Sequence, residues 1–306
     1  MHRWDIVAFG DLCVDFILSG QDVVPEFGQK EKMIDSYSML MGGSTAIFAC
    51  QCAKLGLKPA VVGKVGGDMF GRLIIDELAV CGADTRFITV DPAISTGLTC
   101  ILQGEGDRAM LTVNGGIAEA RFEDAPEDLR QSARHVHIAS YYLMGQLKAG
   151  YPAFLREMRS LGATVSVDTN WDPEERWDGI LELAPLVDVF LPNENEVKAI
   201  TGERDAMEGL KQLSQRFPVA VMKMGDKGAA AIAGGRLYTA EAMKVPFVDA
   251  VGAGDSFDGG FISGWLAGKP IGDCLAMGCY CGSMNVTKRG GTAGQPHRAA
   301  LPEGLR

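Results

Sequence analysis

The sequence lacks any apolar run approaching the roughly 20 residues that a membrane-spanning helix needs. Its opening, MHRWDIVAFGDLCVD, places acids where a secretory signal peptide would be apolar. Basic residues are also scarce, with 29 Lys and Arg against 39 Asp and Glu and a formal net charge of -10. That charge disfavours attraction to nucleic acid or to an anionic membrane surface. These absences predict a cytoplasmic protein with no nucleic-acid partner and no membrane partner.

Cysteine motifs for metals or redox chemistry are missing as well. The eight cysteines form close pairs only as Cys50/Cys52 and Cys279/Cys281, and neither spacing is that of a zinc site or a redox motif. We therefore expect reduced, mostly buried thiols. No GxxxxGK[ST] element occurs, and the GxGxxA match at 104–109 opens no helix. A P-loop enzyme and a dinucleotide-binding fold are both disfavoured.

Short β-rich runs do alternate with helical patterns along the 306 residues. Hydrophobic residues make up 47% and charged residues 22%, as in an ordinary globular protein. The alternation predicts an α/β fold, a mainly parallel central sheet with helices on both faces. The strand-like runs are DIVAFGDLCVDFIL, AVVGKVG, VHIAS, TVSVD, VDVFLPN, VAVMKMG and AAAIAGG, and the helical patterns cover residues 44–56, 70–82, 151–162, 194–202 and 205–216.

Two segments interrupt this alternation of strands and helices, at about residues 13–40 and 94–115, and we expect them to form a small β lid. The second reads as a hairpin around GEGDR. No Pro/Ser-rich linker, long charge run or solenoid repeat divides the chain. Residues 1–306 are therefore predicted to form a single α/β domain with a lid.

The most informative stretch is VDAVGAGDSF, a glycine turn that runs into a long helix of small residues. Glycines let backbone N–H groups point at an anion, and the helix adds the positive end of its dipole. Asp255 at that turn is placed to take a proton from an attacking hydroxyl. The alternative is a plain strand-to-helix turn with Asp255 as a helix cap.

Two more motifs favour nucleotide chemistry. The turn KMGDKG, residues 223–228, ends a strand and suits backbone contact with a nucleotide. Asn193 and Glu196 open a helix and share one face, where oxygen ligands suit hydrated Mg²⁺. A helix cap with a solvated acid is the alternative for this pair.

Two histidines and two tryptophans give weaker indications of a functional role. His135 and His137 alternate on one strand and face the same side, but no third metal ligand lies near them, so packing or hydrogen bonding is favoured. Trp171 and Trp177 pack a loop or border the substrate.

With these motifs in this order, the sequence resembles the ribokinase-like, or PfkB, family of carbohydrate kinases. The resemblance runs from the first strand to the C-terminal helix. Its motifs are Gly42-Gly43 before a helix ending KLG, GKVGGDMFG at 63–71, the Asn193/Glu196 pair, the 223–228 turn and the GAGD turn at 252–255.

The resemblance implies a role for each matching position. Asp255 matches the catalytic base, and Gly252, Ala253 and Gly254 match the anion hole for the transferred phosphoryl group. Asp15, Gly42 and Gly43 match residues that hold the sugar. Asn193 and Glu196 match the motif that organises Mg²⁺ through water, Lys223, Gly225 and Gly228 match the nucleotide loop, and Cys279 matches a position near the adenine. Lys223 could equally be a solvated surface charge.

Departures from the family pattern leave the substrate open. Ile47 stands where many sugar kinases carry an Asn, and Ser44 stands where several relatives have Lys. Ala250 replaces the expected Thr. The first two changes make a ribose substrate doubtful and remove a charge from the pocket wall.

We therefore predict an ATP- and Mg²⁺-dependent sugar kinase that phosphorylates a primary hydroxyl of a sugar or related polyol, with Asp255 as base. A monovalent cation requirement is left open. The alternatives are a nucleoside kinase, which a more apolar wall at Ile47 would suit, and a non-catalytic ligand-binding regulator. A flat lid also exposes edges, so a homodimer through the lid is expected.

Overall fold

The computed structural model describes residues 3–104 and 108–306, and its nine-stranded central sheet defines the fold. The order is β13-β12-β11-β10-β9-β8-β1-β4-β5, parallel from β11 to β5, with β12 and β13 joined antiparallel at one edge. This confirms the predicted α/β class. The strands are β1 Ile6–Phe9, β4 Pro59–Gly66, β5 Ile88–Asp91, β8 His135–Ile138, β9 Thr164–Val167, β10 Val189–Phe190, β11 Val219–Lys223, β12 Ala229–Ala233 and β13 Arg236–Ala240.

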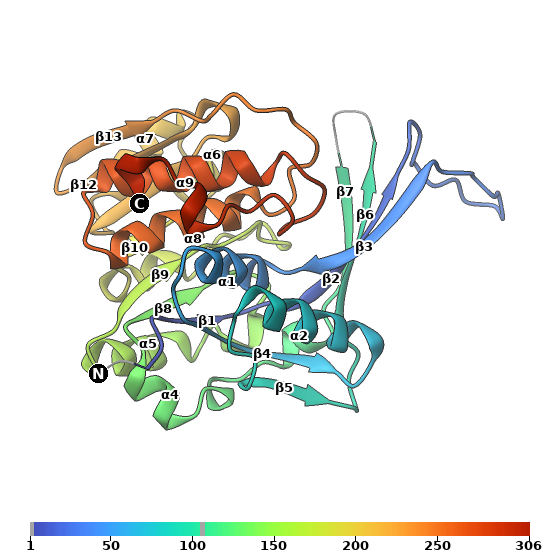
Figure 1. Ribbon diagram of the computed structural model, residues 1–306, viewed down its shortest axis with the longest axis horizontal. Helices are drawn as coiled ribbons and strands as arrows, with labels where there is room; N and C mark the ends of the chain where they lie inside the picture. Colours follow the sequence, from blue (N-terminus) through green and yellow to red (C-terminus); the bar gives the residue numbers. More distant parts are fainter. Residues whose placement is uncertain (1–2, 105–107) are drawn as a thin grey trace.

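Helices cover both faces of this sheet, each over its own apolar core (Figure 1). One face is covered by α1 Ser44–Lys54, α2 Met69–Cys81, α8 Ala253–Leu266 and α9 Ile271–Asn285. The other carries α3 Gly116–Glu119, α4 Glu127–Ser132, α5 Tyr151–Ser160, α6 Glu194–Thr201 and α7 Ala206–Leu213. Burial on both faces explains why the inner strands read as continuous apolar runs. Among the described residues, no helix is long and apolar enough to cross a membrane.

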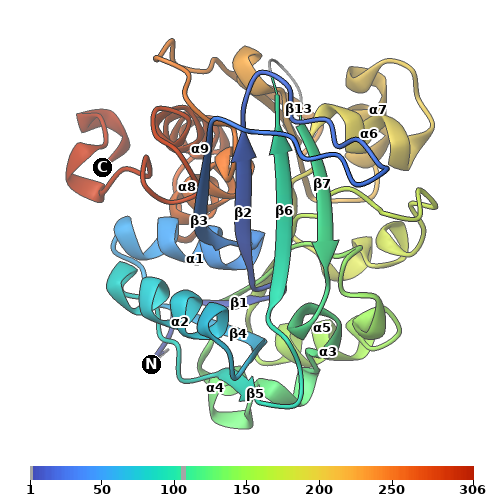
Figure 2. The same ribbon diagram turned by 90° about the vertical axis from the view of Figure 1, so that its right-hand side faces the viewer.

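A second, four-stranded sheet stands beside the main body and forms the lid (Figure 2). Its order is β3-β2-β6-β7, with β2 Cys13–Ser19, β3 Ser36–Gly42, β6 Gly97–Gln103 and β7 Arg108–Val113. The expected hairpin therefore exists as β6 and β7, although residues 105–107 of its GEGDR turn lie outside the described part of the chain. The opening run DIVAFGDLCVDFIL is not one strand, because the chain leaves the central sheet at Gly10 and enters the lid at Cys13.

The two faces of the lid differ in chemistry. One cross-strand row consists of Leu40, Asp15, Thr99 and Thr112. Side chains alternate along a strand, so the neighbouring rows face the opposite way. Those rows are apolar, with Met39, Phe16, Cys100 and Leu111 in one and Met41, Val14, Leu98 and Val113 in another.

The glycine motif at 63–71 anchors the lid to the main body. Asp68 caps α2 by accepting hydrogen bonds from the amides of Phe70 and Gly71. The same carboxylate accepts from the amide and hydroxyl of Thr96, which directly precedes β6. One N-cap carboxylate thus fixes both the start of a helix and the base of a lid strand.

Candidate active site

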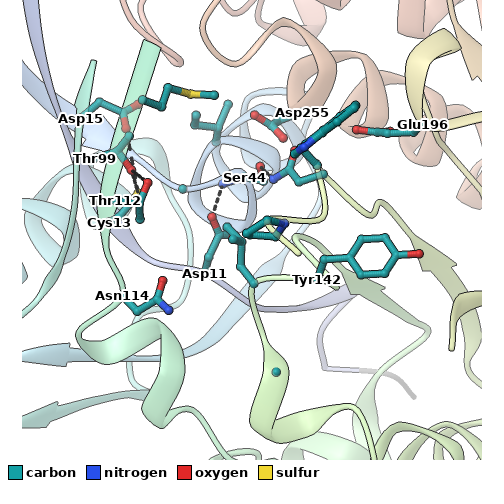
Figure 3. Close-up of a pocket in the computed structure, with 18 of the residues that line it drawn as sticks. Asp11, Cys13, Asp15, Ser44, Thr99, Thr112, Asn114, Tyr142, Glu196 and Asp255 are labelled. Carbon is teal, nitrogen blue, oxygen red and sulfur yellow. Dashed lines mark hydrogen bonds between the residues drawn. The ribbon is translucent and has the colours of Figure 1, made fainter. Parts of the chain in front are cut away.

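A pocket of about 1080 Å³ lies between the lid and the carboxyl ends of the central strands, where ligands bind in open α/β sheets. Figure 3 shows Asp15, Thr99 and Thr112 on the lid side, facing Ser44 and Asp255 across the cavity. The site residues expected from sequence that line it are Asp15, Gly43, Asn193, Glu196, Gly252 and Asp255. The structure therefore brings together residues separated by most of the chain.

Asp255 lies in the first turn of α8, directly after the glycine turn. Gly252 caps the helix with φ 72°, the left-handed conformation that glycine adopts without strain. A Cβ on Gly252 would also lie 2.6 Å from the Cα of Gly291 and 2.9 Å from Ile47. First-turn amides lack partners within a helix, so the turn presents N–H donors beside Asp255 at the positive end of the helix dipole.

The Asp255 carboxyl has an unusual affinity for protons. Burial raises its pKa from 3.8 to about 7, and the charge of Asp168 acts in the same direction. Lys223 and a hydrogen bond from Ser44 oppose that rise in pKa. A carboxyl group with a pKa near the working pH is suited to accept a proton from a substrate hydroxyl.

Lys223, at the end of β11, is the buried cation of the site. Its ammonium lies 3.0 Å from Asp168 and 3.1 Å from Asp258, and its side chain is only 11% exposed. The alternative of a solvated surface charge is therefore wrong. Burial alone would lower the pKa of Lys223, but Asp168 and Asp258 outweigh it and raise that pKa, so the ammonium stays charged.

Carboxyl groups outnumber cations around this ammonium. Burial raises the pKa of Asp258 well above its usual value even though Lys223 acts against it. The pKa of Glu196 rises to about 7 through burial and the nearby charge of Asp168. One buried carboxylate oxygen, Oδ1 of Asp168, has no hydrogen-bond partner among the described residues. The cluster is thus short of positive charge, which contributes to the raised pKa values of Asp258 and Glu196.

Asn193 and Glu196 form a capping box at the start of α6. The Asn193 side chain accepts from the amides of Asn195 and Glu196, while Glu196 accepts from the Asn193 amide at 2.8 Å. The pair therefore does cap the helix, as the alternative interpretation expected. The same interpretation expected Glu196 to be exposed to solvent, whereas Glu196 is buried. Both residues also line the pocket. Lone pairs on their side-chain oxygens that face the pocket can therefore accept hydrogen bonds from water.

Asp11 and Asp15 organise the part of the pocket wall between β1 and the lid. Asp15 is 7% exposed, and burial raises its pKa to about 7, with Asp11 and Asp255 adding to the rise. Its carboxylate occupies the space where a Cβ on Gly42 would stand, which explains glycine at that position. Asp11, which follows β1, accepts hydrogen bonds from the amides of Ser44 and Thr45 and so holds the start of α1.

The nucleotide-loop residues lie outside this pocket. Gly225 and Gly228 belong to the turn between β11 and β12. A Cβ on Gly228 would meet the backbone of Ala240 and Ala242, and the Cys279 thiol donates to the Ala240 carbonyl at 3.6 Å. Gly228 and Cys279 therefore border one segment, residues 240–242, while neither lines the cavity around Asp255.

The other aromatic signals are resolved by the structure. His135 and His137 are buried and hydrogen-bonded to Ser166, and His137 stacks on Phe48 at 3.7 Å between ring centroids. Packing and hydrogen bonding are thus confirmed for the pair. Trp171 packs edge-on against Trp177, as considered for it, and it also lines the pocket, from where it would be able to border a substrate.

The site residues that were not anticipated from the sequence include Asp11, Tyr142, Asp168 and Asp258. Asp11 and Asp168 each follow a strand at the carboxyl edge of the sheet, a position that marks ligand-binding residues in such folds. Asp258 lies three residues after Asp255 on the same helix face. Tyr142, whose buried hydroxyl has no partner among the described residues, had no distinguishing pattern.

Comparison with known proteins identifies the family of the chain and agrees with the fold. A model of the pfkB family of carbohydrate kinases matches residues 4–298. A 2-dehydro-3-deoxygluconokinase of Bacillus subtilis (strain 168) is 30% identical over 314 residues, covering 98% of this chain and 94% of that protein. The chain therefore belongs to the pfkB carbohydrate kinase family. It is an ATP-dependent sugar kinase, a phosphotransferase with an alcohol group as acceptor.

Solved structures share the architecture over their whole length. A fructokinase double mutant from Vibrio cholerae O395, in its fructose, ADP and potassium ion bound form, matches with a TM-score of 0.85 and 25% identity, covering 100% of this chain and 99% of that one. A proposed Ribokinase II from E. coli in complex with ATP and Mg²⁺ matches with a TM-score of 0.84 and 24% identity, covering 97% of both chains. The latter likeness shows the fold.

The buried position of Lys223 predicts a large loss of stability on its removal. Lys223→Met leaves Asp168 and Asp258 buried without their cation, which should lower the free energy of unfolding by about 3–5 kcal/mol. The matched control is Lys227→Met, four residues on, whose side chain is 68% exposed in its ion pair with Glu194. Urea unfolding followed by circular dichroism measures both. Equal losses in the two variants would contradict this electrostatic account.

Proposed function

We propose that the protein transfers the γ-phosphate of ATP to a primary hydroxyl of a neutral sugar or polyol, with Asp255 as the general base. The observation that carries this proposal is the position of Asp255, whose partly exposed carboxyl lines the pocket at the amino end of α8. An acceptor hydroxyl at this carboxylate would lie next to the amides of the Gly252–Gly254 turn. Proton removal and stabilisation of phosphoryl charge would then occur side by side.

The lid side of the pocket suits the hydroxyl groups of an uncharged substrate. Asp15 offers carboxylate acceptors, and Thr99, Thr112 and Asn114 offer hydroxyl and amide groups. Ser44 and Ile47 line the opposite wall on α1. Asp15, Gly42 and Gly43 would hold the sugar so that one primary hydroxyl reaches Asp255.

The charged residues at the rim favour a neutral substrate over an acidic one. Lys148 lies 3.5 Å from Asp178, and Arg176 is paired with Glu174. An anionic substrate would have to compete with these carboxylates. Because these rim cations are already paired, they provide little net attraction for an anion.

The phosphate side of the site fits Mg²⁺ held mainly through water. Asn193, Glu196 and the unpartnered oxygen of Asp168 offer oxygen atoms in a cluster that is short of positive charge. The described residues contain no group of three or more acidic, His or Cys side chains that could cage a metal directly. Mg²⁺ prefers to keep several waters and to bind through phosphates, and when bound it would neutralise charge on the phosphoryl oxygens.

The remaining nucleotide contacts are assigned to the other end of the site. Gly225, Gly228 and Cys279 would border the nucleoside part of ATP along segment 240–242. Lys223 would act from beneath the turn, since a Cβ on Gly254 would lie 3.5 Å from its ammonium nitrogen. Potassium in the fructokinase structure makes a monovalent cation requirement worth testing here.

A keto-sugar acid is the second candidate substrate. The observation in its favour is the 30% identity to a 2-dehydro-3-deoxygluconokinase, together with the presence of Arg108 in the pocket lining. A nucleoside would use the exposed face of Trp171 for stacking. These candidates differ in charge and aromaticity, so one substrate panel separates them.

We predict ADP release that depends on a neutral sugar or polyol and falls by about 10²–10⁴-fold in Asp255→Asn. The assay uses Mg·ATP with sugars, keto-sugar acids and nucleosides, with and without potassium. Asp76→Asn, an exposed position on α2, is the matched control and should keep full activity. Turnover only with keto-sugar acids would show that the substrate is an acidic sugar and would contradict the proposal of a neutral substrate. Full turnover in Asp255→Asn would contradict the assigned base.

The raised pKa of Asp255 also predicts a pH profile. The group works as the deprotonated base, so activity should be lost as the pH falls through its pKa of about 7. Asp168, Lys223, Asp11 and Asp15 interact with this carboxyl, so the apparent value belongs to the cluster. The ratio kcat/KM, measured from pH 5 to 9, should rise to a plateau above about pH 8. A ratio that is already at its plateau at pH 5, as the ordinary aspartate pKa near 3.8 would give, would contradict the prediction.

We also propose that the lid's apolar face pairs with the same face of a second copy of this chain. Tyr37, Leu111 and Val113 on the lid strands are 70%, 64% and 56% exposed. An exposed apolar face that spans four strands is unusual for a monomer. Covering this apolar face in a dimer would also protect the edges of the four-stranded lid sheet.

Light scattering at micromolar concentration should therefore give the mass of a dimer. Leu111→Asp, which places a charge on the apolar lid face, should give a monomer. Leu237→Asp is the matched control, because Leu237 is 51% exposed on β13, far along the central sheet from the lid. A monomeric unmodified protein, or a dimer that survives Leu111→Asp, would show that the lid is not the interface.

A further inference from the structure

Helices α1 and α2 lie side by side (Figure 1). Two thiols, Cys50 and Cys81, meet between these helices, and neither lines the pocket. Cys50 is buried on α1, and Cys81 is the partly exposed last residue of α2. The two thiols share a hydrogen bond. Contact between the helices continues beside them, since a Cβ on Gly82 would lie 3.9 Å from the Cβ of Ala53.

The surroundings of the pair favour a reactive Cys81. The hydrogen bond from Cys50 lowers the pKa of Cys81 to about 7, and Lys54 adds to this effect, while partial burial and Glu77 oppose it. The same hydrogen bond, together with burial, raises the pKa of Cys50. Cys81 can therefore act as the exposed thiolate, with Cys50 as a protonated thiol behind it.

A second pair of neighbouring thiols provides a natural comparison. Cys52 on α1 and Cys281 on α9 also interact, but both are fully buried. A soluble oxidant cannot reach either of them without local unfolding. Access to solvent thus distinguishes the pair Cys50/Cys81 from the pair Cys52/Cys281.

We propose that Cys50 and Cys81 are a peroxide-sensitive dithiol that closes to a disulfide between α1 and α2. The Cys81 thiolate attacks one oxygen of hydrogen peroxide, forming a sulfenic acid and releasing hydroxide, which takes up a proton to become water. Cys50 sulfur then attacks the Cys81 sulfur, the S–O bond breaks, and the Cys50 proton leaves with the departing hydroxide as a second water. The two thiols are oxidised, and one peroxide is reduced.

The disulfide would tie together two helices that support the site. The first turn of α1 holds Ser44 and Ile47 in the pocket wall, and the cap of α2 anchors the lid through Asp68. A bond between these helices would restrict their relative movement, and thiol reductants would reverse it. The inference concerns a different site from the phosphoryl-transfer chemistry and does not depend on it.

The first test treats the intact, unmodified protein with hydrogen peroxide and compares its mass and peptides with an untreated sample. We expect a loss of about 2 Da, restored by dithiothreitol. Trypsin should yield a cross-link between residues 33–54 and 73–86, and fragmentation should place it at Cys50 rather than Cys52. A mass gain confined to Cys81 without a cross-link, or a cross-link between Cys52 and Cys281, would overturn the proposal.

The second test measures the rate of iodoacetamide reaction with Cys81 at pH 7 in the reduced protein. Cys50→Ala removes the hydrogen-bond donor behind Cys81, so the thiolate fraction falls and its intrinsic reactivity rises, for a net slowing of about threefold. Cys281→Ala is the matched control and should leave the rate unchanged. Equal rates in all three proteins, or no reaction at Cys81 before unfolding, would show that the pair is an ordinary structural contact.

Discussion

The structure depends on one buried ammonium and the carboxylates around it. Lys223 joins the end of β11 to Asp168 after β9 and to Asp258 in α8. A buried cation without partners is very costly, so these three elements are held in one arrangement. That arrangement fixes where α8 begins, and with it the positions of Gly252 and Asp255. Stability and the site's electrostatics therefore have a common origin.

The fold and the main motifs could be predicted because they depend on local patterns. Alternating strand and helix periods gave the parallel sheet, and the TGLTCILQ and AMLTVNGG runs gave β6 and β7 of the lid. The glycine turn at 252–254 was recognisable since its residues are contiguous in the chain. Asn193, Glu196 and Asp255 were named from such motifs and Asp15 from the resemblance to the family, and the structure places all four around one pocket.

The features of the fold and the site that could not be predicted depend on contacts between distant segments of the chain, and a local sequence pattern does not indicate such contacts. The partners of Lys223 lie 55 and 35 residues away, so burial could not be told from surface exposure. The opening apolar run reads as one strand, and although the lid was expected to begin at about residue 13, the break at Gly10 is clear only from the structure. The glycines at 63–71 matched a family motif, but the role of Asp68 between α2 and the lid became clear only from its contacts with Thr96.

The central claim is that the buried cluster gives Asp255 a proton affinity suited to a base near neutral pH. Carbon-13 NMR of the protein labelled at aspartate carboxyl groups measures this directly, with the resonance assigned by its loss in Asp255→Asn. The account predicts a main titration step of this resonance at about 7, shifted by any bound cation. Titration near 3.8, the ordinary value, would contradict it.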